Sequence, residues 1–352
     1  MAAVVALGAT AAVAQDAPWQ PMGLMRVRDM TPFGISRLDM LPAYPISRLP
    51  YRFAFEVTFS YQNTWALSQN VRDYLKQRGI ERGPIGPAEI AAIQALPGDA
   101  YMVDGELGLI DLTLHYKAND RLAFYGTIPY VRAGGGFLDG TIENFHRNFG
   151  FDTADREFVP KDELHVVADL ADDSLVLQQP PSAEFGDPVL GARYVVRSAR
   201  HRSAVVLEGA AKLGVHSGDS VFSTSTNDYG IQLLLEHALT RNAFYLSLAA
   251  VDYRAPPASV ADDGWIPTVI GGWEWRVWPR TDFVVQTSVS KSTVQNTTLH
   301  ELSTNKIQVT FGLQWLFRAS SIRFGITENH AHYDNTPDIG VNLTVAGFFG
   351  RR

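Results

Sequence analysis

The residues whose types and spacing could do chemistry stand between positions 139 and 147 of this 352-residue chain. Glu143 and His146 are three positions apart, so on a helix they share one face. Together with Asp139 they could converge on a cation or transfer a proton, because carboxylates and imidazoles serve both purposes. The candidates for ligand binding or gating also include two acids near the start of an earlier strand, and the full set is Asp104, Glu106, Asp139, Glu143, His146 and Arg147.

A short amphipathic helix over residues 141–149 is expected to carry these side chains. Its apolar residues Ile142, Phe145 and Phe149 follow one another at spacings of three and four, and Asp139 or Thr141 would cap its first turn. A structural interpretation stands beside the chemical one, since an E-x-x-H pair often arises by chance. In that interpretation the helix folds inward as a plug, and its polar face bonds to lumen residues such as those at 104–106.

The elements that must position this helix are β-strands. From Tyr51 onward apolar and polar residues alternate, which in a strand sends them to opposite faces. Most of the alternating segments reach the roughly 9 to 11 residues of a tilted membrane crossing, which is longer than a usual globular strand. There are twelve of them: 51–65, 101–117, 121–133, 186–198, 203–216, 227–239, 242–254, 265–278, 281–292, 306–317, 321–330 and 338–349.

The connections between these segments alternate in length. Short polar turns follow residues 117, 198, 239, 278 and 317, and longer connections cover 66–100, 134–185, 217–226, 255–264, 293–305 and 331–337. Outer-membrane barrels have this asymmetry, with the short turns in the periplasm, whereas a soluble sandwich has no reason to keep it. We therefore predict an all-β fold, a closed antiparallel transmembrane β-barrel of about 12 strands over residues 51–352, with short periplasmic turns and long outer loops, one carrying a short helix.

Charged residues on the non-lipid face of these strands form a set of eleven: Arg52, Glu56, Asp111, His115, Arg193, Glu208, Lys212, Glu236, Glu274, Arg276 and Arg323. Its five acids balance its five Lys and Arg residues. Such a set would most simply interlock as ion pairs that fill the interior. A solute path is the alternative, although a pore selective for one sign of charge would show an excess of the other. Aromatic girdles are expected from Trp65, Trp273, Trp275, Trp278, Trp315, Tyr130 and Tyr253.

Residues 1–14 resemble the end of a signal peptide. They form an apolar run that finishes in Ala12-Val13-Ala14 but lacks a basic start, which suggests a reading frame begun at an internal Met; a disordered apolar tail is the alternative. Residues 15–50 contain six prolines and should be an irregular periplasmic extension, either a plug in the barrel mouth or a segment lying across it. Residues 88–96 are expected to form a second short helix.

Composition excludes several classes of protein. The chain has no Cys, which removes disulfide scaffolds, thiolate metal sites and cysteine nucleophiles. A net charge of -7 argues against a nucleic-acid partner. No motif indicates a nucleotide, so we predict no cofactor and no metal.

Four stretches together resemble a known family: 63–65, 104–106, 134–150 and 186–192. They are similar to those of the exported bacterial family called domain of unknown function 3187, and the similarity extends over nearly the whole mature chain, including residues 26–33. Members of that family look like Gram-negative outer-membrane barrels without an established activity, so the resemblance implies location and fold but no reaction. One departure is the end of the chain, where Phe349 is followed by Gly350-Arg351-Arg352 instead of ending the barrel.

Three functions remain open at this stage. The first is a non-enzymatic outer-membrane barrel that passes or binds a small solute, with the inward loop setting access. The second is an outer-leaflet enzyme that modifies lipid or lipopolysaccharide, for which His330 and His332 would be bases, although no nucleophile motif accompanies them. The third is a structural surface protein. Expected partners are outer-membrane lipid and lipopolysaccharide, the barrel-assembly machinery and an unknown small solute.

Overall fold

The computed structural model describes residues 19–43, 50–170, 173–198, 202–215, 220, 222–255, 260–331 and 335–351. The expected signal-peptide remnant at 1–14 and His332 lie outside the described residues. No helix in the described part of the chain is long and apolar enough to span a membrane.

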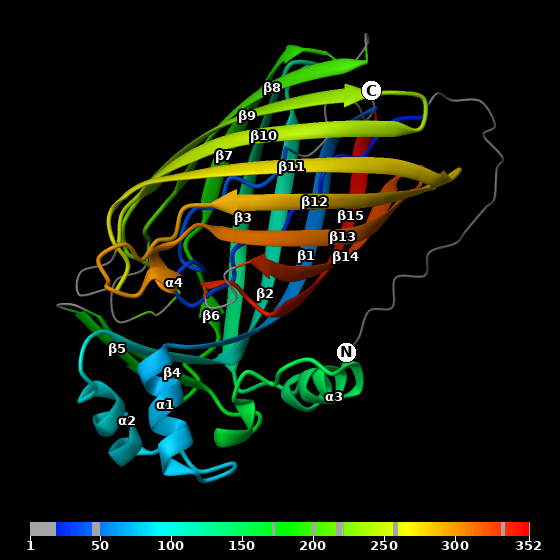
Figure 1. Cartoon of the computed structure of the whole chain (residues 1–352). Coiled ribbons are helices and arrows are strands. Elements are labelled where there is room, and N and C mark those ends of the chain that lie inside the picture. The colour runs from blue at the N-terminus through cyan, green and yellow to red at the C-terminus, as the bar shows by residue number, and fades with distance from the viewer. Residues whose placement is uncertain are drawn as a thin grey trace, which may run out of the picture.

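Twelve long strands close into an antiparallel barrel (Figure 1). The chain's first strand, β1, pairs with β2 on one side and with the last strand, β15, on the other, and every neighbouring pair around the ring is antiparallel. This confirms the predicted fold class. The barrel strands are β1 (Tyr51–Leu67), β2 (Ala100–Lys117), β3 (Leu122–Gly134), β7 (Val189–Arg197), β8 (Ser203–Lys212), β9 (Asp228–Ala238), β10 (Asn242–Tyr253), β11 (Gly264–Trp278), β12 (Thr281–Ser290), β13 (Lys306–Leu316), β14 (Ser320–Ala331) and β15 (Ile339–Arg351).

Polar and apolar residues alternate along each strand, so the polar ones face the barrel interior and the apolar ones face outward. On β1, Glu56, Thr58 and Ser60 are buried inside, whereas Phe55 and Phe59 are 45% and 42% exposed outside. The same outward exposure recurs around the ring, which forms the belt that a barrel presents to lipid. The girdle prediction is wrong at two positions, because Trp65 and Tyr253 are almost fully buried.

The two ends of the barrel differ. One end, here called the short-turn end, carries the tight connections such as the one between β2 and β3, and the other, the long-loop end, carries the longer ones. The long loops contain α1 (Gln69–Arg78), α2 (Pro87–Gln94), α3 (Asp139–Phe149), the 3-10 turn Arg156–Phe158, α4 (His300–Ser303) and the short strands β4 (His165–Leu170), β5 (Asp173–Leu177) and β6 (Glu184–Phe185).

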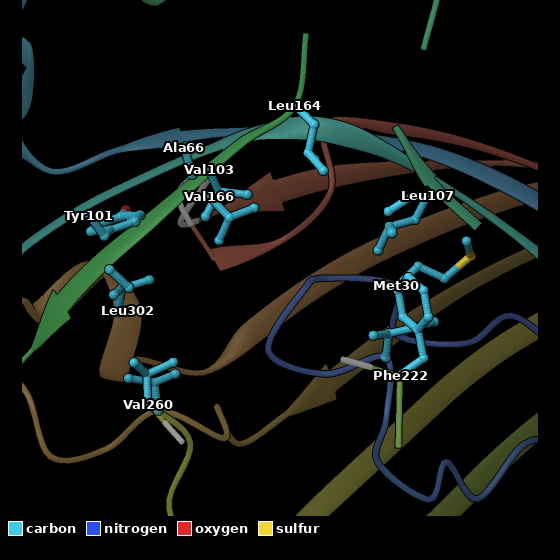
Figure 2. Close-up of a cluster of buried hydrophobic side chains, with 14 of the residues drawn as sticks. Met30, Ala66, Tyr101, Val103, Leu107, Leu164, Val166, Phe222, Val260 and Leu302 are labelled. Atoms are coloured by element: carbon cyan, nitrogen blue, oxygen red, sulfur yellow. The ribbon is translucent and has the colours of Figure 1, made fainter. Parts of the chain in front are cut away.

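A small sheet rises from the wall at the long-loop end, and we call it the flap: β4, β5 and residues 100–104 of β2. Its two faces have different neighbours because side chains alternate. Met102 and Val167 pack with α1 and α2, outside the barrel. Val103 and Val166 belong to the other face, in a cluster with residues of the barrel interior (Figure 2).

The predicted helices are found close to their expected bounds. Residues 88–96 correspond to α2, which packs through Ile90 and Ile93 against α1 and the flap. Residues 141–149 fall within α3, but the cap prediction is wrong, because Asp139 is already helical and its carboxylate bonds elsewhere. The sequence reasoning missed α1, β4, β5, β6 and α4.

Residues 19–43, here called the lumen segment, run through the inside of the barrel. Near the short-turn end the Trp19 indole donates to Asp282 at the start of β12. At the long-loop end Thr293 donates its hydroxyl to the Phe33 carbonyl at 2.9 Å. The segment then turns back, and the Met40 carbonyl accepts a hydrogen bond from Gln232 on β9 at 2.8 Å. It therefore crosses the lumen from one mouth to the other and returns part of the way.

Candidate functional site

Two buried ion pairs join the lumen segment to the first strands of the barrel. The Arg26 guanidinium lies 3.0 Å from the Glu56 carboxylate, and that of Arg28 lies 3.3 Å from Asp111. All four side chains are at most a tenth exposed. A charge buried this deeply is tolerated only with a partner, so each strand residue depends on the segment.

A third group of charges holds the turn of the segment near the long-loop end. Asp29 pairs with Lys306 at the start of β13, and the Arg37 guanidinium lies 3.3 Å from Asp29 and 2.6 Å from Asp39. Backbone bonds from Gly34 and Ile35 to the Thr31 carbonyl close the turn. The turn is therefore fixed both to itself and to the wall.

The first part of the lumen segment, residues 19–30, is not a strand of the sheet. Side chains of the barrel interior form hydrogen bonds with its backbone instead. The Glu274 carboxylate accepts the Met22 and Gly23 amides at 2.7 and 3.0 Å. The Gln286 amide both accepts from the Met25 N–H at 2.7 Å and donates to its carbonyl at 3.1 Å. Buried backbone groups need such partners, so these side chains fix the path of the segment.

Inward-facing glycines make room for the apolar side chains of the segment. A Cβ on Gly272 would lie 2.3 Å from Leu24, and one on Gly230 would lie 2.5 Å from the Met40 sulfur. On β13 and β14, Gly312 and Gly325 would each bring a Cβ to 2.9 Å from the Met25 side chain. Glycines within strands often mark a close approach of another chain segment. In this barrel they allow the lumen segment to pack closely against the wall.

Nine of the eleven predicted lumen charges are buried: Glu56, Asp111, His115, Arg193, Glu208, Lys212, Glu236, Glu274 and Arg323. Arg52 is exposed, and Arg276 is half-buried near the short-turn end, where it donates to the Pro279 carbonyl at 2.6 Å. Among the buried nine, five acids face three Lys and Arg residues. Glu208 pairs with Arg193 inside this set, as expected of interlocking strand charges. Glu56 and Asp111 pair instead with Arg26 and Arg28 of the lumen segment.

The six ligand or gating candidates lie elsewhere, around α3. Alternation along β2 places Asp104 and Glu106 on the face opposite to Asp111. The Glu106 carboxylate accepts the Phe137 and Leu138 amides at 3.1 and 2.6 Å, which anchors the start of α3. Arg147 is exposed.

Arg156 fastens the α3 loop to the outward face of the wall. Its guanidinium donates to Asp139 at 3.0 Å and to Asn63 of β1 at 2.9 Å, also bonds Asp338, and lies 4.9 Å from the centre of the Trp65 ring. Burial raises the pKa of Asp338, although Arg156 opposes the effect. The expectation that this loop folds inward is wrong, because its anchors are outward residues of β1 and the lumen already holds residues 19–43 (Figure 1).

Glu143 and His146 do not converge. The Glu143 carboxylate lies 2.5 Å from Arg82 and 2.6 Å from Lys161, whereas the His146 ring lies 2.6 Å from the Asp152 carbonyl. Burial would raise the pKa of Glu143, but the bonds from Lys161 and Arg82 outweigh burial and hold the pKa below its usual value. Within the described ranges no three His, Cys, Asp or Glu residues are grouped to hold a metal.

A cavity of about 520 Å³ lies at the long-loop end, between the turn of the lumen segment and the inner face of the flap. Figure 2 shows Val103, Val166 and Leu164 on one side of this region, and Met30 and Phe222 on the other. Sequence reasoning missed it because its walls come from segments far apart in the chain.

Comparison with known families identifies the chain. The sequence profile described as protein of unknown function DUF3187 matches residues 85–347. The chain belongs to the DUF3187 family. The predicted family is thereby confirmed, and no curated protein matches.

Among solved structures, this DUF3187 protein is similar to the COG4313 outer membrane channel from Pseudomonas putida F1. The two share a TM-score of 0.52 and 11% identity, over 85% of this chain and 96% of that one. Weaker likenesses are the P. putida toluene transporter TodX, with a TM-score of 0.39, 9% identity and coverage of 87% and 92%, and the KdgM porin, with 0.38, 10%, 72% and 97%. At such identities the likeness shows the fold alone, and by name these proteins are a channel, a transporter and a porin.

Proposed function

We propose that this protein is an outer-membrane barrel of a Gram-negative bacterium that passes or binds a small solute, and that the lumen segment controls access. The observation that carries the proposal is the course of residues 19–43, which occupy the barrel from the short-turn end to the long-loop end. In this arrangement the short-turn end faces the periplasm and the flap faces the outside.

The contacts of the segment suit a part that moves. Much of its attachment is polar, through Arg26, Arg28 and the backbone bonds to Glu274 and Gln286. When the segment leaves and water fills the lumen, water can hydrate the polar groups that are uncovered, which offsets part of the lost interaction energy. A barrel of twelve strands is also wider than one that its own side chains fill, so displacing the segment would open a path.

Conductance in planar bilayers tests this proposal. We expect low conductance from the wild type and higher conductance from the double variant Arg26→Ala/Arg28→Ala, because both ion pairs to the wall are lost. Arg52→Ala is the matched control, since Arg52 is an exposed arginine on β1. Deletion of residues 19–43 should raise conductance further.

Folding must be checked alongside conductance. Each variant is tested for the gel-mobility shift on heating that marks a closed barrel. Folded double-variant and deletion proteins that conduct no more than wild type would overturn the proposal.

A further inference from the structure

We propose that the cavity at the long-loop end binds a neutral, largely apolar small molecule. The inference rests on the proposed function, because it gives the solute a chemical class. The cavity volume of about 520 Å³ falls in the range of small-molecule sites, which is roughly 300–1,000 Å³. The walls come from the turn of the lumen segment, the flap, the barrel wall and two long loops.

Apolar side chains from several elements make up most of the lining. The lumen segment supplies Phe33 and Ile35, β5 of the flap supplies Leu175 and Leu177, and the loop before β9 supplies Phe222. An apolar molecule enclosed by these side chains is removed from water, which stabilises the bound state in proportion to the apolar area buried.

The lining offers no free charge. Glu106 is the single charged residue that lines the cavity among the described residues, and its carboxylate already accepts the Phe137 and Leu138 amides. A charged ligand would lose its hydration without gaining a partner, which is strongly unfavourable. The ligand class is therefore neutral.

Three of the hydroxyl groups in the lining are also engaged, and the first is that of Ser220, which donates to Glu184. The Ser223 hydroxyl donates to Asp187 at 2.7 Å, and the Thr224 hydroxyl accepts a hydrogen bond from Lys212. Lys212 donates in turn to the Ser36 carbonyl of the lumen segment at 2.7 Å. A ligand with many hydroxyls, such as a sugar, would find few partners, whereas a ring or short chain with one polar group fits.

The ligand would touch the part that we propose to move. Phe33 and Ile35 lie in the turn of the lumen segment, and Ile35 is buried in the same cluster as Val103 and Val166. A molecule in the cavity therefore contacts both the flap and the turn. Phe33 and Ile35 would therefore take part both in binding the ligand and in displacing the lumen segment.

The test uses two neighbouring residues of β5. Leu175 is half-buried against the cavity, whereas Val176 points to the other face and is 38% exposed. The protein is placed in nanodiscs and titrated calorimetrically with 1-naphthol, a neutral probe, and with 1-naphthalenesulfonate, its anionic counterpart. We expect 1-naphthol to bind at one site and the sulfonate not to bind. Leu175→Trp should weaken naphthol binding by about tenfold or more, because the indole overfills the site, and Val176→Trp should leave it within about twofold.

Three outcomes would overturn the inference: no naphthol binding above that of empty nanodiscs, equal binding of the sulfonate, or equal loss in the two tryptophan variants. The assay needs no flux, so it separates the two proposals. Naphthol binding without conductance in the gating variants would count against the proposed function alone, and conductance without naphthol binding would count against the ligand class alone.

Discussion

The guanidinium of Arg28 lies 3.3 Å from the carboxylate of Asp111, halfway along β2 and inside the barrel. Arg28, which comes before the first barrel strand in the sequence, thus supplies the ion-pair partner of a residue on β2. Both side chains are at most a tenth exposed, so neither charge has water as an alternative partner.

Removing one member of this pair should destabilise the barrel. We expect Arg28→Ala to lower the free energy of unfolding by about 3–5 kcal/mol, because Asp111 is left as a buried, unpaired charge. The double variant Arg28→Ala/Asp111→Leu should recover most of that loss. Urea unfolding in lipid vesicles measures both. An additive double variant would show that the two residues do not interact, and Arg52→Ala should stay within about 0.5 kcal/mol of wild type.

A second prediction concerns Gly272 and its neighbour Gly271 on β11. A Cβ at Gly272 meets Leu24 of the lumen segment, whereas a Cβ at Gly271 meets nothing within 4 Å. Gly272→Val should displace the segment and expose Arg26 and Arg28 to trypsin, while the barrel strands stay protected. Gly271→Val is the control and should be cleaved like wild type. Equal protection of the segment in both variants would contradict the close packing described here.

A third prediction concerns the attachment of α3. Arg156→Met removes the bonds to Asp139, Asn63 and Asp338 while it keeps a long side chain. Loss of this buried network, at about 3 kcal/mol, should speed hydrogen exchange of residues 139–158 by roughly 100-fold. Exchange of the barrel strands is the internal reference and should not change. Uniform acceleration across the chain would instead indicate global destabilisation.

The same loop should loosen in acid. The pKa of Glu143 is held below its ordinary value of 4.5, so the ionised form is favoured by folding. Its contribution is complete above that ordinary value and is lost as the pH falls through it toward the lower pKa of the folded state. Trypsin cleavage at Lys161, compared between pH 7 and pH 4 after correction for protease activity, should rise. Glu143→Gln should show a smaller dependence on pH, and an unchanged dependence would rule out this carboxyl as its source.

The sequence predicts the barrel well because its signal is local. Alternation over ten residues is enough to recognise β13, where Ile307, Phe311 and Trp315 share one face. The observed bounds of that strand, Lys306–Leu316, differ by one residue from the predicted 306–317. The spacing of α3 is local too, and its observed end, Phe149, is the predicted one.

The interior could not be predicted in the same way. The partners of Arg26, Leu38 and Met22 lie on β1, β9 and β11, and no spacing in residues 19–43 encodes a choice among twelve strands. One signal was available: the inward positions of Gly272 and Gly312 indicate that something packs closely there. The position of α3 outside the lumen could not be predicted either, because Arg156 determines it. Arg156 belongs neither to α3 nor to a strand, so no local pattern points to it.

The closure of the ring has a consequence for how the protein is made. β1 pairs with β15, so the sheet becomes a ring only when the last strand of the chain is present. The lumen segment precedes β1 in the sequence, so it is already present when β15 closes the ring. The strands can therefore curl around it, and no loose end has to be threaded through a finished ring. We therefore expect the lumen segment to be packed as the ring closes, and an open lumen would require its later displacement.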